Sequence, residues 1–201
     1  MLIRMLGIDP SISNVGYAVV DYNVGAAQPF DVVKVGLIET APGDKKMKVR
    51  KSSDDLRRAR DLATGINDVI DLYKIKIATA EVPFGAQSAR AALSNGVCIG
   101  LLASLRVPVI EVNPAEVKLA SHGTKTADKE DICRWAVGIA PHPAVGWPTS
   151  KAGNDWQIAV GHRWLTKKAE HPADAVAAVA AAVRTEQFKQ LIGVLSALNI
   201  S

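Results

Sequence analysis

The N-terminal part of the chain contains three apolar runs separated by a few polar positions, a pattern typical of strands joined by hairpins. The runs cover residues 2–9, 15–21 and 31–39, and the turn SISN (11–14) joins the first two. Two later apolar runs, at 75–82 and 107–112, alternate with helical segments. Strands that alternate with helices favour parallel pairing. We therefore expect an α/β fold with a mixed five-stranded sheet, in which three antiparallel strands are followed by two parallel ones.

Apolar residues spaced by three and four positions predict the flanking helices. The longest is expected over 53–73, capped by Ser53 or Asp54, with an apolar stripe formed by Leu56, Ala59, Ala63, Ile66, Ile70 and Tyr73. Others are expected at 86–105, after Asn113-Pro114, and at 127–139, 172–184 and 186–198. Residues 141–170 contain Pro, Gly and Trp without a clear period. We interpret the 201 residues as a single domain with an insertion at about 141–170.

Acidic residues stand at the ends of two predicted strands. Asp9 ends the first strand in LGIDPS (6–11), and Glu81 ends the fourth in AEVP (80–83). A charge in such a setting is unfavourable unless it is paired or binds a cation. A third acid, Asp174, follows His171 by three positions, which places both on one side of a helix if Pro172 is its first residue.

The helix that carries these two residues is rich in alanine, so it can approach a sheet closely and bring Asp174 and His171 to the strand carboxylates. Three crowded carboxylates repel one another and raise their pKa values. Two bound Mg²⁺ ions, with Mn²⁺ as a substitute, would remove that repulsion and support phosphodiester hydrolysis. Taken singly, each acid also fits a turn, a cap or the first turn of a helix, where the helix dipole favours it.

The charged residues indicate what kind of partner the protein binds, and the cysteines indicate the compartment in which it works. The formal net charge is +4, and the segment KKMKVRK (45–51) holds five basic residues, with Arg57, Arg58 and Arg60 soon after. Such a run fits nucleic acid contact or a solvated loop about equally well. The two cysteines, Cys98 and Cys133, do not form a disulfide framework. Without a signal peptide or an apolar run long enough for a membrane span, we expect a cytoplasmic protein, associated with the nucleoid if it is bacterial and in the host cytoplasm if a phage encodes it.

Four segments together resemble the RuvC-type Holliday junction resolvases of the ribonuclease H-like superfamily. They are LGIDPSISNVGYAVVD (6–21), AEVPF (80–84), VNPAEVKLASHGTKTADKEDI (112–132) and HPADAVAAVA (171–180). The resemblance covers roughly residues 2–184 outside 141–170. It implies a ribonuclease H-like nuclease domain that cuts four-way or otherwise branched DNA by metal-dependent hydrolysis, as a homodimer giving paired symmetric nicks.

The resemblance also implies roles for particular residues. The metal-binding catalytic set would be Asp9, Glu81, His171 and Asp174. Many family members carry Asp in place of His171, which leaves this imidazole open as a ligand or as a general base. The alternative is a helix cap that hydrogen-bonds Glu170 or the backbone. Two lysines, Lys118 and Lys129, would lie near the scissile phosphate. Phe84 would enter the junction centre, although packing after Pro83 explains an aromatic residue there equally well.

Other features have two interpretations each. The basic loop, with Lys45, Lys46, Lys48, Arg50 and Lys51, is expected to follow DNA phosphates. The tryptophans at 135, 147, 156 and 164 can stack on bases or pack a small core. The helix at 86–105 has a stripe suited to a dimer interface or to core packing, formed by Ala89, Ala92, Leu93, Gly96, Val97, Gly100 and Leu101. Competing functions are an actin-like phosphotransferase fragment and a catalytically silent junction-binding module.

Overall fold

A mixed five-stranded sheet forms the centre of the protein. The computed structural model describes residues 1–44, 46, 49–154 and 156–197. The strands follow the order β3-β2-β1-β4-β5, with β1 pairing antiparallel to β2 and parallel to β4. Their bounds are β1 Leu2–Asp9, β2 Asn14–Asn23, β3 Phe30–Glu39, β4 Ile77–Glu81 and β5 Val109–Val112. The predicted sheet, three antiparallel strands followed by two parallel ones, is therefore confirmed.

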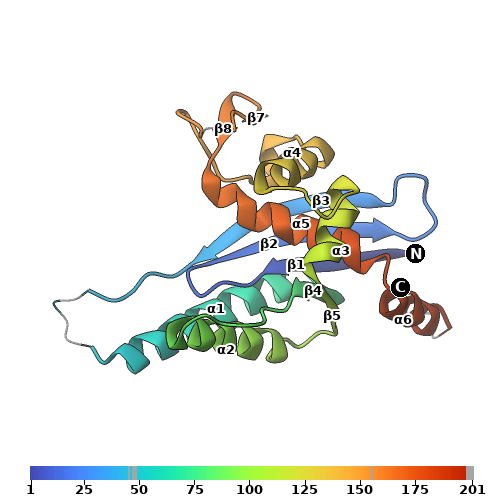
Figure 1. Cartoon of the computed structure of the whole chain (residues 1–201). Coiled ribbons are helices and arrows are strands. Elements are labelled where there is room, and N and C mark those ends of the chain that lie inside the picture. Colours follow the sequence, from blue (N-terminus) through green and yellow to red (C-terminus); the bar gives the residue numbers. More distant parts are fainter. Residues whose placement is uncertain (45, 47–48, 155, 198–201) are drawn as a thin grey trace.

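Helices cover both faces of this sheet (Figure 1). Two of them, α1 (Lys51–Tyr73) and α2 (Ala89–Ala103), pack on one face around Leu62 and Ile66. The other face is covered by α5 (Glu170–Ala182), which α3 (Pro114–His122) and α4 (Lys129–Ile139) cover in turn. The last helix, α6 (Glu186–Ala197), attaches through buried Phe188, whose ring meets Tyr22 edge to face.

Helix α5 lies unusually close to the sheet. A Cβ atom built on Gly7 of β1 would lie 1.9 Å from the carbonyl oxygen of Ala175, and one on Gly16 of β2 would lie 2.3 Å from the carbonyl carbon of His171. Only glycine fits at such distances. The alanines of α5 are buried from Ala175 to Ala182, as their small size predicted. This approach brings the first turn of α5 onto the β1–β2 hairpin.

Helix α1 differs from its prediction at its start and along its buried face. It begins at Lys51 with Arg50 as N-cap, and Asp54 instead accepts a hydrogen bond from the Gly43 amide and pairs with Arg57. Leu56, expected in the core, is 52% exposed. The buried face runs through Asp55 and Arg58, because both charged side chains find partners inside the fold.

Residues 141–170 form a small three-stranded sheet beside α4. The strands are β6 (Thr149–Ser150), β7 (Ala159–Val160) and β8 (Arg163–Leu165), in the order β6-β8-β7, between the 3₁₀ helices η2 (Pro143–Val145) and η3 (Lys167–Ala169). Trp147 is buried and donates a hydrogen bond to the Ala140 carbonyl, and Trp135 and Trp156 pack against the same core. Trp164 is 38% exposed. Three of the four tryptophans thus have the packing role.

Candidate active site

The two strand carboxylates lie at the same edge of the sheet. Because Ile8 of β1 pairs with Ala80 of β4 in parallel register, the next residues along each strand, Asp9 and Glu81, stand at corresponding positions. Burial raises the pKa of Glu81, and the negative charge of Asp9 raises it further. The two carboxylates therefore influence each other electrostatically, as the sequence predicted.

His171 is the direct partner of Asp9. Its Nδ1 atom lies 2.6 Å from Oδ2 of Asp9, and this contact raises the pKa of His171 against the opposing effect of burial. The expected position of His171 as helix cap is wrong. Helix α5 begins at Glu170, directly after η3, so Pro172 falls inside the first turn, where its missing N–H costs no hydrogen bond. Position 171 still meets Asp9 because Gly16 lets the helix backbone approach.

Asp174 is the carboxylate most affected by its surroundings. Burial raises its pKa to about 7, with further contributions from the charges of Asp9 and Glu81. Among the side chains that the structure describes, no three His, Cys, Asp or Glu residues come close enough to share one metal ion. The residues of the predicted set thus share one end of the sheet, and Asp9 and His171 are the pair in direct contact.

The two predicted lysines line a cleft together with Glu81 and Asp174. A cavity of about 330 Å³ is lined by Glu81, Pro114, Val117, Lys118, Ala127, Asp128, Lys129, Ile132 and Asp174. Lys118, on α3, is half-buried and lowers the pKa of Glu81 through its charge, in opposition to burial. Lys129 opens α4 behind the capping box of Asp128 and Asp131. Lys118 is thus partly withdrawn from solvent, whereas Lys129 is a first-turn residue with a side chain 61% exposed that also lines the cavity.

The donor chemistry of this site fits divalent cations. Its three carboxylates offer the hard oxygen ligands that Mg²⁺ and Mn²⁺ prefer, and the imidazole adds a nitrogen. The charges of Asp9 and Glu81 both raise the pKa of Asp174, so this cluster carries repulsion that a cation relieves. In this structure, Nδ1 of His171 contacts the Asp9 carboxylate of this cluster.

Two residues outside the predicted set support the site. Glu170 accepts a hydrogen bond from Lys129, with Oε2 2.6 Å from Nζ, and its Oε1 lies 3.8 Å from Nε2 of His171. Arg58, only 3% exposed, donates to the Ile12 carbonyl and to the Ser13 hydroxyl in the turn that follows Asp9. The sequence signals for both were weak: an acid beside His171, and a charge four positions before buried Leu62.

The predicted DNA-contacting residues differ in their exposure. Phe84 is 84% exposed in the loop after β4, so it does not serve to pack the core. Lys46, Arg50 and Lys51 are exposed, whereas Lys45 and Lys48 lie outside the described residues. Of the three arginines that follow the loop, Arg57 pairs with Asp54 and Asp61, and Arg58 is buried.

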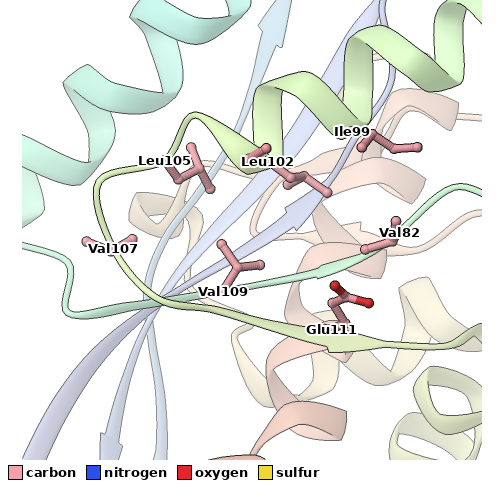
Figure 2. A pocket seen from close by; sticks show the side chains of 8 residues that line it. Val82, Ile99, Leu102, Leu105, Val107, Val109 and Glu111 are labelled. Atoms are coloured by element: carbon pink, nitrogen blue, oxygen red, sulfur yellow. The ribbon is translucent and has the colours of Figure 1, made fainter.

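A second cavity, of about 280 Å³, lies between the end of α2 and the edge strand β5 (Figure 2). Apolar side chains surround it, among them Ile99, Leu102 and Val109, and Glu111 is its acidic member. With one carboxylate and no basic residue in its lining, it does not offer the chemistry of the catalytic cleft. The buried cysteines Cys98 and Cys133 are free thiols, as expected.

In the described part of the chain, the helices are too short or too polar to cross a membrane.

Comparisons with known proteins identify a family to which the sequence is similar. The family model described as "Crossover junction endodeoxyribonuclease RuvC" matches residues 5–139, which contain Asp9, Glu81, Lys118 and Lys129. The RuvC protein of Prochlorococcus marinus (strain MIT 9313) is 36% identical over 132 residues, covering 64% of this chain and 78% of the relative. RuvC of Rhodococcus jostii (strain RHA1) is 29% identical over 190 residues, covering 92% and 94%.

The fold has a solved counterpart of the same extent. The structure "T. thermophilus RuvC in complex with Holliday junction substrate" superposes with a TM-score of 0.62 and 20% identity, covering 95% of this chain and 96% of the other. This match supports the ribonuclease H-like architecture over nearly the whole chain. The family model, and not this fold match, contradicts the actin-like phosphotransferase interpretation. With the family model covering residues 5–139, the chain belongs to the RuvC family of crossover junction endodeoxyribonucleases.

Proposed function

We propose that this protein resolves Holliday junctions by metal-dependent hydrolysis of DNA phosphodiester bonds, giving paired symmetric nicks. The observation that carries the proposal is one cleft lined by Glu81, Asp174, Lys118 and Lys129, beside which the charge of Asp9 raises the pKa of Asp174, in a chain of the RuvC family. Other branched DNA is a secondary substrate class. A catalytically silent junction-binding module would have no need for three carboxylates whose charges oppose one another.

We assign metal binding to Asp9, Glu81, His171 and Asp174. The RuvC family depends on divalent metal, and we propose two Mg²⁺ ions for this chain, with Mn²⁺ able to replace them. When bound, such ions lower the pKa of a coordinated water and stabilise the leaving oxygen. His171 must release its contact with Asp9, or lose its proton, to offer Nδ1 as a ligand.

The remaining side chains of the cleft act on the phosphate and on the proton. Lys118 and Lys129 place positive charge where the phosphate gains negative charge in the transition state. If His171 instead acts as a general base, Asp9 orients its ring through Nδ1, so that Nε2 takes the proton of the attacking water. A His171→Asp variant separates these roles, because Asp occupies this place in other family members. Activity should persist if position 171 supplies a ligand.

DNA binding is assigned to the surface around the cleft. Phe84, on an exposed loop, is proposed to enter the junction centre and stack there. The basic loop residues Lys46, Arg50 and Lys51, together with Lys45 and Lys48, are proposed to contact phosphates. The exposed face of α2 is proposed as the two-fold interface of a homodimer, because symmetric cleavage requires two active sites related by a two-fold axis.

A cleavage assay tests the proposal directly. A labelled four-way junction and a linear duplex of matching sequence are incubated with the protein and Mg²⁺ or Mn²⁺. We expect paired nicks on the junction alone, abolished by a metal chelator and by Asp9→Asn. Cleavage that survives Asp9→Asn would contradict the assignment of that carboxylate, and equal cutting of both substrates would contradict junction selectivity.

A further inference from the structure

We propose that Glu170 is a positioning residue that holds the ammonium group of Lys129 at the mouth of the catalytic cleft. The inference rests on the proposed function, and it adds a residue outside the predicted catalytic set. Glu170 lies on the first turn of α5, directly before His171, and Lys129 is the first residue of α4. Their contact therefore joins the beginnings of two helices that both line the site.

The geometry gives Glu170 two neighbours. Its Oε2 atom accepts a hydrogen bond from Nζ of Lys129 at 2.6 Å, and its Oε1 atom lies 3.8 Å from Nε2 of His171. The Glu170 side chain is 24% exposed and that of Lys129 is 61% exposed, so the pair stands at the rim of the cleft. An acid in the first turn of a helix is also favoured by the helix dipole, which steadies Glu170 in turn.

Lys129 needs such an anchor because the other carboxylates of the site also attract its ammonium group. A lysine side chain is a flexible stem with a compact charge, and it loses conformational freedom only when a partner holds it. The charges of Asp174 and Asp9 act on Lys129 in addition to its bond with Glu170. An ammonium group drawn onto those carboxylates would occupy the place that a divalent cation needs. Glu170 keeps the charge at the rim, where a phosphate approaches.

Lys118 provides an internal contrast. It lines the same cavity and acts electrostatically on Glu81. Within the described residues it forms no ion pair, and it is half-buried on α3. Packing can therefore restrain Lys118, whereas the more exposed Lys129 depends on Glu170. The two lysines thus line the same cleft, Lys118 restrained by packing and Lys129 by its ion pair with Glu170.

The test is a double-mutant cycle on junction cleavage at saturating metal. Glu170→Gln keeps the size of the side chain but removes its charge, and we expect kcat to fall about 10-fold or more while junction affinity stays within about 2-fold. In a Lys129→Ala background the same change should have little further effect. The matched control is Glu130→Gln, which breaks a comparable ion pair to Arg134 on the same helix, and it should leave kcat unchanged.

A second measurement needs neither DNA nor metal. The rate at which a lysine-specific reagent modifies Lys129, followed by mass spectrometry, should rise in Glu170→Gln and stay constant in Glu130→Gln. Unchanged labelling, or an equal loss of kcat in both backgrounds, would overturn the proposal. Failure of the wild-type protein to cut junctions would instead contradict the proposed function, because the labelling result does not depend on cleavage.

Discussion

Helices α2 and α5 resemble each other in composition and lie in opposite environments. In α5 every residue from Ala175 to Ala182 is buried, whereas α2 buries only Cys98, Leu101 and Leu102 along its length. The small residues of α5 meet glycines of the sheet, but a Cβ on Gly96 or Gly100 of α2 would meet open space. Small residues thus permit close approach without revealing the partner: α5 faces its own sheet, and α2, we propose, faces a second copy.

The contact between α5 and β1 should be the least tolerant of added volume. Gly7→Val would place side-chain atoms inside the backbone of Ala175, and we expect unfolding free energy to fall by at least about 4 kcal/mol. Chemical denaturation measured by circular dichroism checks this. A near-wild-type midpoint would show that α5 does not lie as close to β1 as the structure shows.

Substitution of Asp174, near the beginning of α5, should change stability and activity in opposite directions. In the metal-free protein the pKa of Asp174 is about 7, above the ordinary value of 3.8 that applies to the unfolded chain. Between these two pH values, the folded state therefore holds a proton that the unfolded state has lost. Stability should therefore fall as pH rises from about 4 to 7, and Asp174→Asn should remove that loss, with a gain of roughly 2–4 kcal/mol at pH 8.

Cleavage by Asp174→Asn should fall at least about 1,000-fold. Denaturation at pH 5 and pH 8 without metal, beside the junction assay, measures both effects. A stability difference between Asp174→Asn and wild type that is the same at both pH values would contradict the assigned pKa.

The exposed face of α2 should affect assembly without affecting folding. Leu93 is 47% exposed, so Leu93→Glu should change unfolding free energy by no more than about 0.5 kcal/mol. Burying the new charge in the proposed interface would instead dissociate the dimer, seen as a halved mass in sedimentation and as loss of paired nicks. A Leu93→Glu variant that remains dimeric would place the interface elsewhere.

Substitutions in the basic loop, which lies outside α2 and α5, should have a smaller and graded effect on DNA binding. Replacing Lys46, Arg50 and Lys51 with Ala should weaken binding to junctions of any sequence. The slope of log affinity against log salt should become shallower by about 1 for each phosphate that the protein no longer neutralises. Titrations of labelled junction at several salt concentrations measure that slope. An unchanged slope would remove this loop from the DNA-binding surface.

The smallest effect should come from adding one methyl group at a glycine of α2. Gly96→Ala adds one methyl group in open space within a helix, and we expect the isolated monomer to gain up to about 1 kcal/mol. Thermal unfolding in the dissociated Leu93→Glu background isolates this gain. Destabilisation there would mean that α2 packs against its own chain at this position.

The sequence was sufficient for the five strands, their antiparallel and parallel pairing and most helices, because their apolar periods were regular. It also indicated Asp9, Glu81 and Asp174, since acids at the ends of apolar strands and on an alanine-rich helix require a counter-charge or a proton. It could not locate the start of α5, because η3 continues into the helix without a capping side chain. The small sheet at 149–165 escaped prediction because its strands are two and three residues long.

Charged residues with structural roles were the main source of error. Arg58 looked like part of a basic surface, yet it is buried and donates to the turn after Asp9. Glu170 was expected only as a partner of His171, yet it also accepts a hydrogen bond from Lys129, 41 residues earlier. Sequence periodicity reports which positions are apolar, and it contains no information on which distant polar atoms a charge will meet.

The position of α5 has a consequence for the protein as it is being synthesised. This helix lies at the centre of the fold but follows all five strands of the main sheet along the chain, so one face of the sheet stays uncovered until residues 170–182 leave the ribosome. Asp9 precedes its partners His171 and Asp174 by more than 160 positions. Such distant contacts slow folding and expose apolar surface while they form. They also mean that a nascent chain cannot assemble the proposed metal site, and so cannot cut DNA, before residue 174 has emerged.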